Sequence, residues 1–166
     1  MKTNFGTRRV AALHVAIAST LFAQNALAAT IELSEAFKYN AFIFNDFDGE
    51  RSDVEGTLAV GGNLTVEHFD VGLLLEPNLS SSSLYVGGDL NYTHGQVHGG
   101  QVTVSGMITA ESVSFDGALN SGGSSSVKYG NIETGGIFSK GDVTLDSAGL
   151  NQGNIESEGS VTITSA

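Results

Sequence analysis

The residues of this chain best suited to chemistry gather in one acidic stretch, residues 45–55, which reads Asn-Asp-Phe-Asp-Gly-Glu-Arg-Ser-Asp-Val-Glu. Oxygen donors of this kind suit Ca²⁺, which takes carboxylate and carbonyl ligands. With Gly49 at the sixth position of a calcium loop, the first position falls on Phe44, which cannot bind an ion, so an EF-hand is disfavoured. Two interpretations stay open. One is a polar turn in which Asp53 or Glu55 accepts backbone N–H groups, and the other is a looser calcium site formed by Asp46, Asp48, Asp53 and Glu55.

A second group of potential ligands is the histidines. His94 and His98 lie four residues apart, which on a helix would place both imidazoles on one face. Gly95, Gly99 and Gly100 oppose a helix, His68 lies elsewhere, and the sequence offers no obvious third ligand. Surface histidines in a turn are therefore the favoured interpretation.

Catalytic patterns are weak throughout the chain. No serine stands in a Gly-x-Ser-x-Gly phrase. Polysaccharide lyases and glycosidases use clustered carboxylates on similar folds, but this chain has few Arg or Lys side chains to bind an anionic sugar. We assign no catalytic residue and no cofactor, and a carbohydrate-active enzyme stays the alternative.

The elements that carry these residues follow from a recurring phrase, a glycine step followed by an apolar–polar–apolar triplet. It occurs in residues 60–66, 86–92, 98–104, 139–145 and 157–163. The triplet alternates between two faces, and we expect the glycines to turn the backbone with positive φ. A repeated unit of two strands joined by a glycine corner predicts an all-β fold, namely a parallel and right-handed β-helix.

The lengths of the rungs are less regular in the sequence. Glycines 62, 88, 100, 141 and 159, taken as corners, share no period. Residues 130–134 and 153–157 resemble each other at an offset of 23, which we take as one rung, and residues 71–83 are predicted to be an insertion. The outward threonines either form a ladder or are ordinary strand residues; they are Thr65, Thr103, Thr144 and Thr162.

The start of the fold is expected to be a cap, because a solenoid end otherwise exposes apolar side chains and unpaired strand edges. Residues 33–39 are predicted to be a short helix and residues 41–44 a buried strand. At the other end the chain stops at Ala166, shortly after a strand-like segment, so we expect a fragment or a last rung that pairs with something else.

The first residues are predicted to be a secretory signal peptide, residues 1–28, with a basic start, an apolar run and the cleavage pattern Ala26-Leu27-Ala28. The mature domain, residues 29–166, keeps 7 − 3 = 4 basic residues against 18 acidic ones, a net charge of −14. This charge disfavours nucleic acid and anionic lipid, and the apolar run is too short for membrane insertion. Cysteine is absent, so stability must come from burial.

The segments 41–49 and 52–65, with their aromatic strand, Asp-Phe step, Ser-Asp-Val-Glu-Gly and Gly-Gly-Asn-Leu-Thr, resemble the opening of the choice-of-anchor A domain family. That resemblance implies an adhesive domain of bacterial surface or secreted proteins. We therefore expect an exported protein that presents a β-helix face to a matrix polymer, a carbohydrate or a cell-surface protein. A structural matrix component that associates with itself is the third interpretation.

Overall fold

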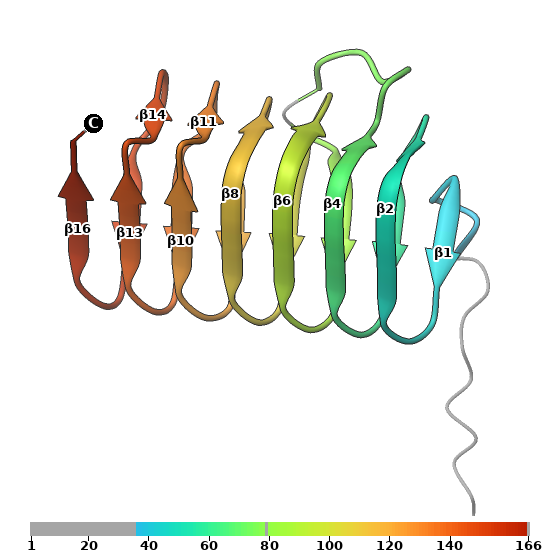
Figure 1. Cartoon of the computed structure of the whole chain (residues 1–166), viewed down its shortest axis with the longest axis horizontal. Coiled ribbons are helices and arrows are strands. Elements are labelled where there is room, and N and C mark those ends of the chain that lie inside the picture. Colours follow the sequence, from blue (N-terminus) through green and yellow to red (C-terminus); the bar gives the residue numbers. More distant parts are fainter. Residues whose placement is uncertain (1–35, 79, 166) are drawn as a thin grey trace, which may run out of the picture. The chain divides into compact units, whose positions relative to one another are not determined.

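The computed structural model describes residues 36–78 and 80–165, which form a parallel β-solenoid of seven rungs (Figure 1). One strand of each rung belongs to a narrow sheet of seven short strands, in the order β1(Ala41–Ile43), β3(Leu58–Val60), β5(Ser82–Val86), β7(Gln101–Val104), β9(Leu119–Ser121), β12(Ile137–Ser139) and β15(Ile155–Ser157). Every recorded strand pair is parallel, as the repeated phrase predicts.

The other strands form a wide sheet on the opposite side. Its main path runs from β2(Phe47–Val54) through β4(Leu64–Val71), β6(Leu90–Val97), β8(Ile108–Phe115), β10(Ser125–Lys128) and β13(Val143–Asp146) to β16(Val161–Thr164). Two short strands, β11(Asn131–Ile132) and β14(Gly149–Leu150), continue the ladder of the second half of β8.

Each rung bends once within or after its wide-sheet strand, at a residue with φ between 50° and 58°. These seven residues are Arg51, His68, His94, Ser112, Tyr129, Ser147 and Ser165. This bend separates the wide sheet from a third side, and the turns at the two ends of each narrow-sheet strand form the other two corners of the rung. The third side consists of the halves of β2, β4, β6 and β8 beyond the bend, with β11 and β14.

The bend residues also give the rung length. Their spacing is 17 or 18 residues except between His68 and His94, where it is 26. The 8 or 9 extra residues lie between Val71 and Leu84, which confirms the insertion predicted at residues 71–83. The predicted 23-residue rung is wrong: Ile132 pairs on the third side, whereas Ile155 pairs with Ile137 in the narrow sheet.

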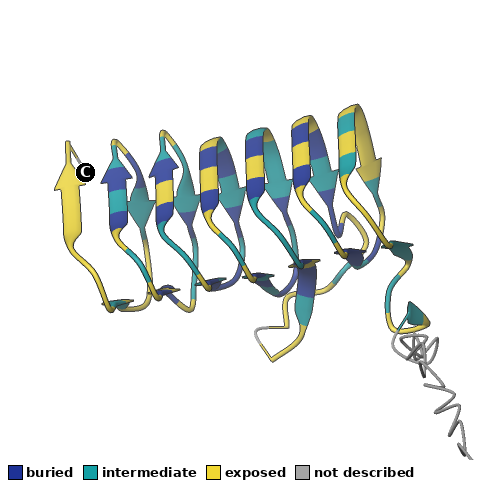
Figure 2. Ribbon diagram, turned by 90° about the horizontal axis from the view of Figure 1, so that it is seen from below, coloured by how far each residue is buried: buried dark blue, intermediate teal, exposed yellow. Residues whose placement is uncertain are grey.

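The core fills the space between the three sides. In the second rung six inward side chains are 0–3% exposed, namely Leu58, Val60, Leu64, Val66, Phe69 and Val71. Figure 2 shows the resulting bands of buried and exposed residues along the wide-sheet strands. The inward members of the predicted triplets, among them Val102, Val104, Val143 and Leu145, are buried, as expected. Each such side chain contributes roughly 1.5–3 kcal/mol when fully buried.

The later rungs replace some inward valines by serine. At the inward position of Val60 in the second rung, the fifth to seventh rungs carry Ser121, Ser139 and Ser157. Their hydroxyls donate hydrogen bonds of 2.7–2.8 Å to the carbonyls of corner glycines one rung earlier: Gly106, Gly123 and Gly141. The interior therefore tolerates these polar groups because each has a partner.

The N-terminal segment differs from expectation in two ways. Residues 45–55 are not one acidic turn, because Phe47–Val54 is β2, paired along its length with β4. The strand predicted at 41–44 is present as β1 but is only half-buried, since it forms the edge of the narrow sheet.

The predicted helical cap stays a prediction. Residues 33–35 lie outside the described residues, and the following residues form a turn closed by the Tyr39 N–H and the Ala36 carbonyl, 3.2 Å apart. Every element within residues 36–78 and 80–165 is a strand. In this part of the chain no helix has the length and apolarity needed to cross a bilayer.

Candidate functional site

The outer surface of the wide sheet is the most regular surface of the solenoid, and we call it the wide face. Its first file of outward residues runs across the seven rungs as Asp48, Thr65, Asn91, Thr109, Ser126, Thr144 and Thr162. Strands in a sheet lie about 4.8 Å apart, so the file is a row of hydroxyl, amide and carboxylate groups at that spacing. All seven residues are exposed or half-buried.

Of the two interpretations of the outward threonines, the ladder is present in part. Thr65, Thr144 and Thr162 share the first file, but Thr103 pairs with Tyr85 and Asn120 in the narrow sheet. The members that sequence reasoning missed are Asn91, Thr109 and Ser126. A repeat length of 17 or 18 would have aligned them.

A second file lies two residues further along each strand and gives the wide face its charge. It comprises Glu50, Glu67, Thr93, Glu111, Lys128, Asp146 and Thr164, with four carboxylates and one ammonium group. Between the first three rungs the two files border a shallow depression of about 340 Å³, lined by Asp48, Gly49, Glu50, Thr65, Val66, Glu67, Asn91 and Thr93. The face thus offers hydrogen-bonding groups in an anionic setting.

The outer surface of the narrow sheet, the narrow face, is less uniform. Its outward positions are held by Phe42, Ala59, Tyr85, Thr103, Asn120, Phe138 and Glu156, of which Ala59 is buried. A pocket of about 450 Å³ lies over the last four rungs, with the half-exposed ring of Phe138 between Asn120 and Glu156 and with Lys140 at its border. An aromatic surface with a few polar groups is typical of small-ligand sites.

The four carboxylates of the predicted calcium site lie at different parts of the first rung, and all are exposed. Asp48 belongs to the first file of the wide face, Asp53 lies on the third side in register with Asp70, and Glu55 follows β2. Asp46 accepts the Asn63 N–H at 2.7 Å. The backbone-binding role expected for Asp53 or Glu55 is thus filled by Asp46, and calcium binding by the four residues stays a prediction.

Asp46 begins a ladder of side chains that runs along one corner of the solenoid. Asn63 Oδ1 accepts the Asp89 N–H at 2.9 Å, and Asp89 Oδ1 accepts the Met107 N–H at 2.8 Å. Met107 interrupts the ladder because it has no acceptor of this kind. Beyond it, Ser124 accepts the Asp142 N–H and Asp142 accepts the Ser160 N–H.

The side chains of this corner ladder, rather than a positive φ, explain why glycine recurs at the corner. The glycines at this corner, between the narrow and the wide sheet, include Gly106 and Gly123, whereas Gly100, grouped with them in the sequence, lies between β6 and β7 at the corner that joins the third side to the narrow sheet. None of the corner glycines 62, 88, 106, 123, 141 and 159 has positive φ, so that expectation is wrong for them, whereas Gly99, in the phrase at residues 98–104, has φ of +87°. A Cβ at Gly62, Gly88 or Gly106 would instead overlap with the ladder side chain of the preceding rung. Glycine is required there for close approach.

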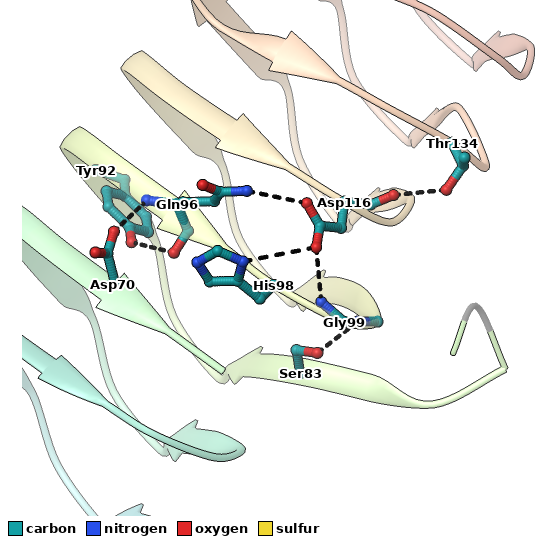
Figure 3. Close-up of polar contacts among 9 residues, drawn as sticks. Asp70, Ser83, Tyr92, Gln96, His98, Gly99, Asp116 and Thr134 are labelled. Carbon is teal, nitrogen blue, oxygen red and sulfur yellow. Dashed lines mark hydrogen bonds and ion pairs between the residues drawn. The ribbon is translucent and has the colours of Figure 1, made fainter. Parts of the chain in front are cut away.

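A network of polar contacts joins successive rungs on the third side (Figure 3). Asp70 accepts the Gln96 N–H at 2.8 Å, and the Gln96 Nε2 donates to Asp116 Oδ1 at 3.1 Å. The other oxygen of Asp116 accepts the Gly99 N–H at 3.0 Å and lies 3.8 Å from His98 Nδ1. His98 therefore belongs to this network and contributes to the packing of the third and fourth rungs.

The Tyr92 hydroxyl lies at the buried edge of the same network. It donates to the carbonyls of Phe69 and Gln96. Burial of the phenol, with the negative charge of Asp70 nearby, raises the pKa of Tyr92 far above its usual value. The tyrosine is thus neutral at physiological pH and serves the core.

Two histidines from neighbouring rungs come together. His68 and His94 occupy the same bend position in neighbouring rungs, and their rings stack with centroids 4.6 Å apart at 14°. His94 and His98 do not pair, in agreement with the disfavoured helix, because His98 lies beyond the end of β6 and faces Asp116. Recognising the observed pair from the sequence requires knowing the 26-residue offset between β4 and β6.

One of the comparisons with known proteins identifies a family. Residues 32–138, more than half of the 166-residue chain, match a family described as "Putative Ice-binding-like adhesive domain". No curated protein and no solved structure matches the chain. The chain belongs to the family of ice-binding-like adhesive domains.

Proposed function

We propose that this protein is an exported adhesive domain that binds a hydroxyl-rich, uncharged polymer, such as a neutral polysaccharide, through its wide face. The observation that carries the proposal is the first file, whose hydroxyl and amide groups stay in register over the seven rungs. A polymer with repeated hydroxyl groups can form many weak hydrogen bonds along such a row. Because the sheet is already ordered, binding requires little loss of conformational entropy from the protein.

The charge of the wide face narrows the class of partner. Glu50, Glu67 and Glu111 in the second file repel polyanions, while their carboxylates accept hydrogen bonds from polymer hydroxyls. The screening length is about 8 Å at physiological salt, so this repulsion acts at contact range. Neutral polysaccharide is therefore favoured over nucleic acid, acidic polysaccharide and anionic lipid.

The same proposal includes export and attachment. Residues 1–28 have the pattern of a signal peptide, and an adhesive domain acts outside the cell. The motifs in residues 41–65 support a closer relationship to choice-of-anchor A domains. We take the solenoid to be right-handed, because right-handed crossovers are the rule for parallel strands.

We propose binding without catalysis. Among the carboxylates of the first rung, Asp46 already accepts the Asn63 N–H, and Asp48 and Asp53 lie on opposite sides of the Arg51 bend. A glycosidase requires two carboxyl groups that face each other across a sugar. Neither the hydrogen-bonded Asp46 nor the separated pair Asp48 and Asp53 provides such facing carboxyl groups, so adhesion is favoured over a carbohydrate-active enzyme.

Retention on immobilised polymers tests the proposal, with neutral glucans, uronic-acid polymers and cell-surface proteins in separate arms. Thr109→Arg places a bulky side chain on the wide face, and Thr103→Arg places the same side chain on the narrow face of the same rung. We expect Thr109→Arg to weaken retention on neutral glucan about tenfold, equivalent to about 1.4 kcal/mol, and Thr103→Arg to change it less than about twofold.

Three results would overturn the proposal. Equal effects of the two arginines would remove the wide face from the interaction. Wild-type protein that is not retained on neutral glucan but forms oligomers in sedimentation would indicate the structural role. Release of new reducing ends from the polymer would indicate the enzyme. Circular dichroism of each variant establishes that the solenoid is intact.

A further inference from the structure

The stacked histidines lie at the border between the wide face and the third side, next to a carboxylate. His68 Nε2 is 3.6 Å from Glu67 Oε1, and the side chains of these two residues are 48% and 52% exposed. One donor atom from each of Glu67, His68 and His94 lies within 4.8 Å of the other two. From this geometry we propose that the three residues form a binding site for a borderline transition-metal ion, with Zn²⁺ as the representative.

The backbone sets this arrangement. Both histidines have φ near 50°, which turns the chain at the same point of adjacent rungs. Since Glu67 pairs with Thr93 and Phe69 with Gly95, the residues between them are aligned directly across the two strands. The imidazoles are thus held in neighbouring positions by the strand ladder.

The distances are within reach of metal coordination. Zn–N bonds of 2.0–2.1 Å place the donors of a tetrahedral site roughly 3.3 Å apart. The exposed side chains can close from their present separation by rotation about their χ angles alone. No buried group needs to move, because Glu67, His68 and His94 are all exposed.

The donor set also selects the class of ion. Two imidazole nitrogens and one carboxylate suit Zn²⁺, Cu²⁺ or Ni²⁺, whereas Ca²⁺ and Mg²⁺ prefer oxygen ligands alone. Three protein ligands leave one position of a tetrahedral ion open to water or an external donor. The site is therefore distinct from the predicted calcium site of the first rung.

The surrounding charges are compatible with a cation. Arg51 occupies the bend position next to His68, but its guanidinium is paired with Glu50. On the other side, Ser112 occupies the bend position next to His94, and Glu111 lies in the second file. The net charge of the chain, −11, adds a general attraction for cations.

Isothermal titration of the untagged full chain with ZnCl₂ tests the site. We expect one Zn²⁺ per chain, and an affinity at least about tenfold lower in His68→Gln and in His94→Gln. His98→Gln is the matched control, because His98 contacts Asp116 in the third-side network and not the cluster. It should leave the affinity unchanged.

A second readout identifies the ligands. Cu²⁺ bound to the wild type should show the electron paramagnetic resonance splitting of two imidazole nitrogens, and His94→Gln should show that of one. Failure of the wild type to bind Zn²⁺ overturns the proposal, as does equal binding by wild type, His68→Gln and His94→Gln. These measurements do not use a polymer, so their outcome is independent of adhesion.

Discussion

Gly95 lies against the buried ring of Tyr92, and a Cβ on Gly95 would be 2.9 Å from Tyr92 Cε2 and would overlap with the Phe69 carbonyl oxygen. The inward position on the third side is held by Phe69 in the second rung and by Val113 in the fourth. In the third rung the tyrosine ring fills that space from the wide sheet. One large residue and one glycine thus share a volume that neighbouring rungs divide between two apolar side chains.

Gly95→Ala should destabilise the solenoid strongly. The new methyl group has no space, and φ of +151° at this residue is unfavourable for alanine. We expect a loss of about 3 kcal/mol in the free energy of unfolding, measured by urea denaturation. Gly149→Ala is the matched control, since its Cβ would meet only the end of the Asn131 side chain. Equal losses in the two variants would contradict the packing described for Tyr92.

Tyr92 should make the protein sensitive to alkaline pH. The folded-state pKa is raised above the unfolded value, so the stabilisation is complete below about pH 10 and is lost as pH rises further. Between these two pKa values the free energy of unfolding should fall by about 1.4 kcal/mol per pH unit.

Tyr92→Phe should abolish this alkaline slope, because phenylalanine does not titrate. At pH 7 the variant should also be less stable by about 1–3 kcal/mol, since the carbonyls of Phe69 and Gln96 lose their hydroxyl partner. Urea denaturation at several pH values measures both effects. An identical slope in wild type and variant would show that another group controls the alkaline transition.

Met107→Asn should stabilise the protein. Met107 is half-exposed at the one position where the corner ladder is interrupted between Asp89 and Ser124. An asparagine there repeats the arrangement of Asn63 and provides an acceptor for the backbone of the next rung. We expect a gain of about 0.5–1 kcal/mol, seen as a rise in Tm by differential scanning calorimetry. Met107→Leu, which adds no acceptor, should leave Tm nearly unchanged.

Two aspartates of the first rung should differ in their effect on stability. Asp46→Ala removes the acceptor of the Asn63 N–H and should cost about 1 kcal/mol. Asp48→Ala alters an exposed residue on the wide face and should change stability by less than about 0.5 kcal/mol. Chemical denaturation of both variants without divalent ions makes the comparison. A larger effect of Asp48→Ala would contradict the role assigned to Asp46.

The predicted calcium site can be tested separately by the effect of Ca²⁺ on thermal stability. Added Ca²⁺ should raise the Tm of the wild type, because a ligand that binds only the folded state stabilises it. Asp48→Ala and Asp53→Ala should each reduce that rise, whereas Glu111→Ala, a carboxylate of the wide face remote from the first rung, should not. A wild-type Tm that does not respond to Ca²⁺ would remove the site.

The sequence predicts the kind of fold well because alternation is a local signal. Val102 and Val104, or Val143 and Leu145, are recognisable as inward pairs from their own triplets. The length of a rung cannot be predicted in the same way, because the bend residues differ in type, as Arg51, His68 and Tyr129 do, and share only a backbone angle. Without the rung length, a glycine such as Gly100 cannot be separated from those at the corner between the narrow and the wide sheet.

The candidate surfaces could be predicted only in part for the same reason. Residues 45–55 look like a turn because β2 carries Gly49 and charged outward groups, and its inward residues are few. The pairing of His68 with His94 spans the insertion, so no fixed spacing in the chain indicates it. Register across strands is a long-range property, and a local pattern does not contain it.

The insertion between Val71 and Leu84 has a practical meaning for protein engineering. Its 8 or 9 additional residues leave the wide-sheet register before and after them unbroken, with Leu64 opposite Leu90 and Val71 opposite Val97. That corner already accommodates extra chain without disturbing the stack. A guest peptide inserted at this corner would be displayed on a β-solenoid that contains no cysteine.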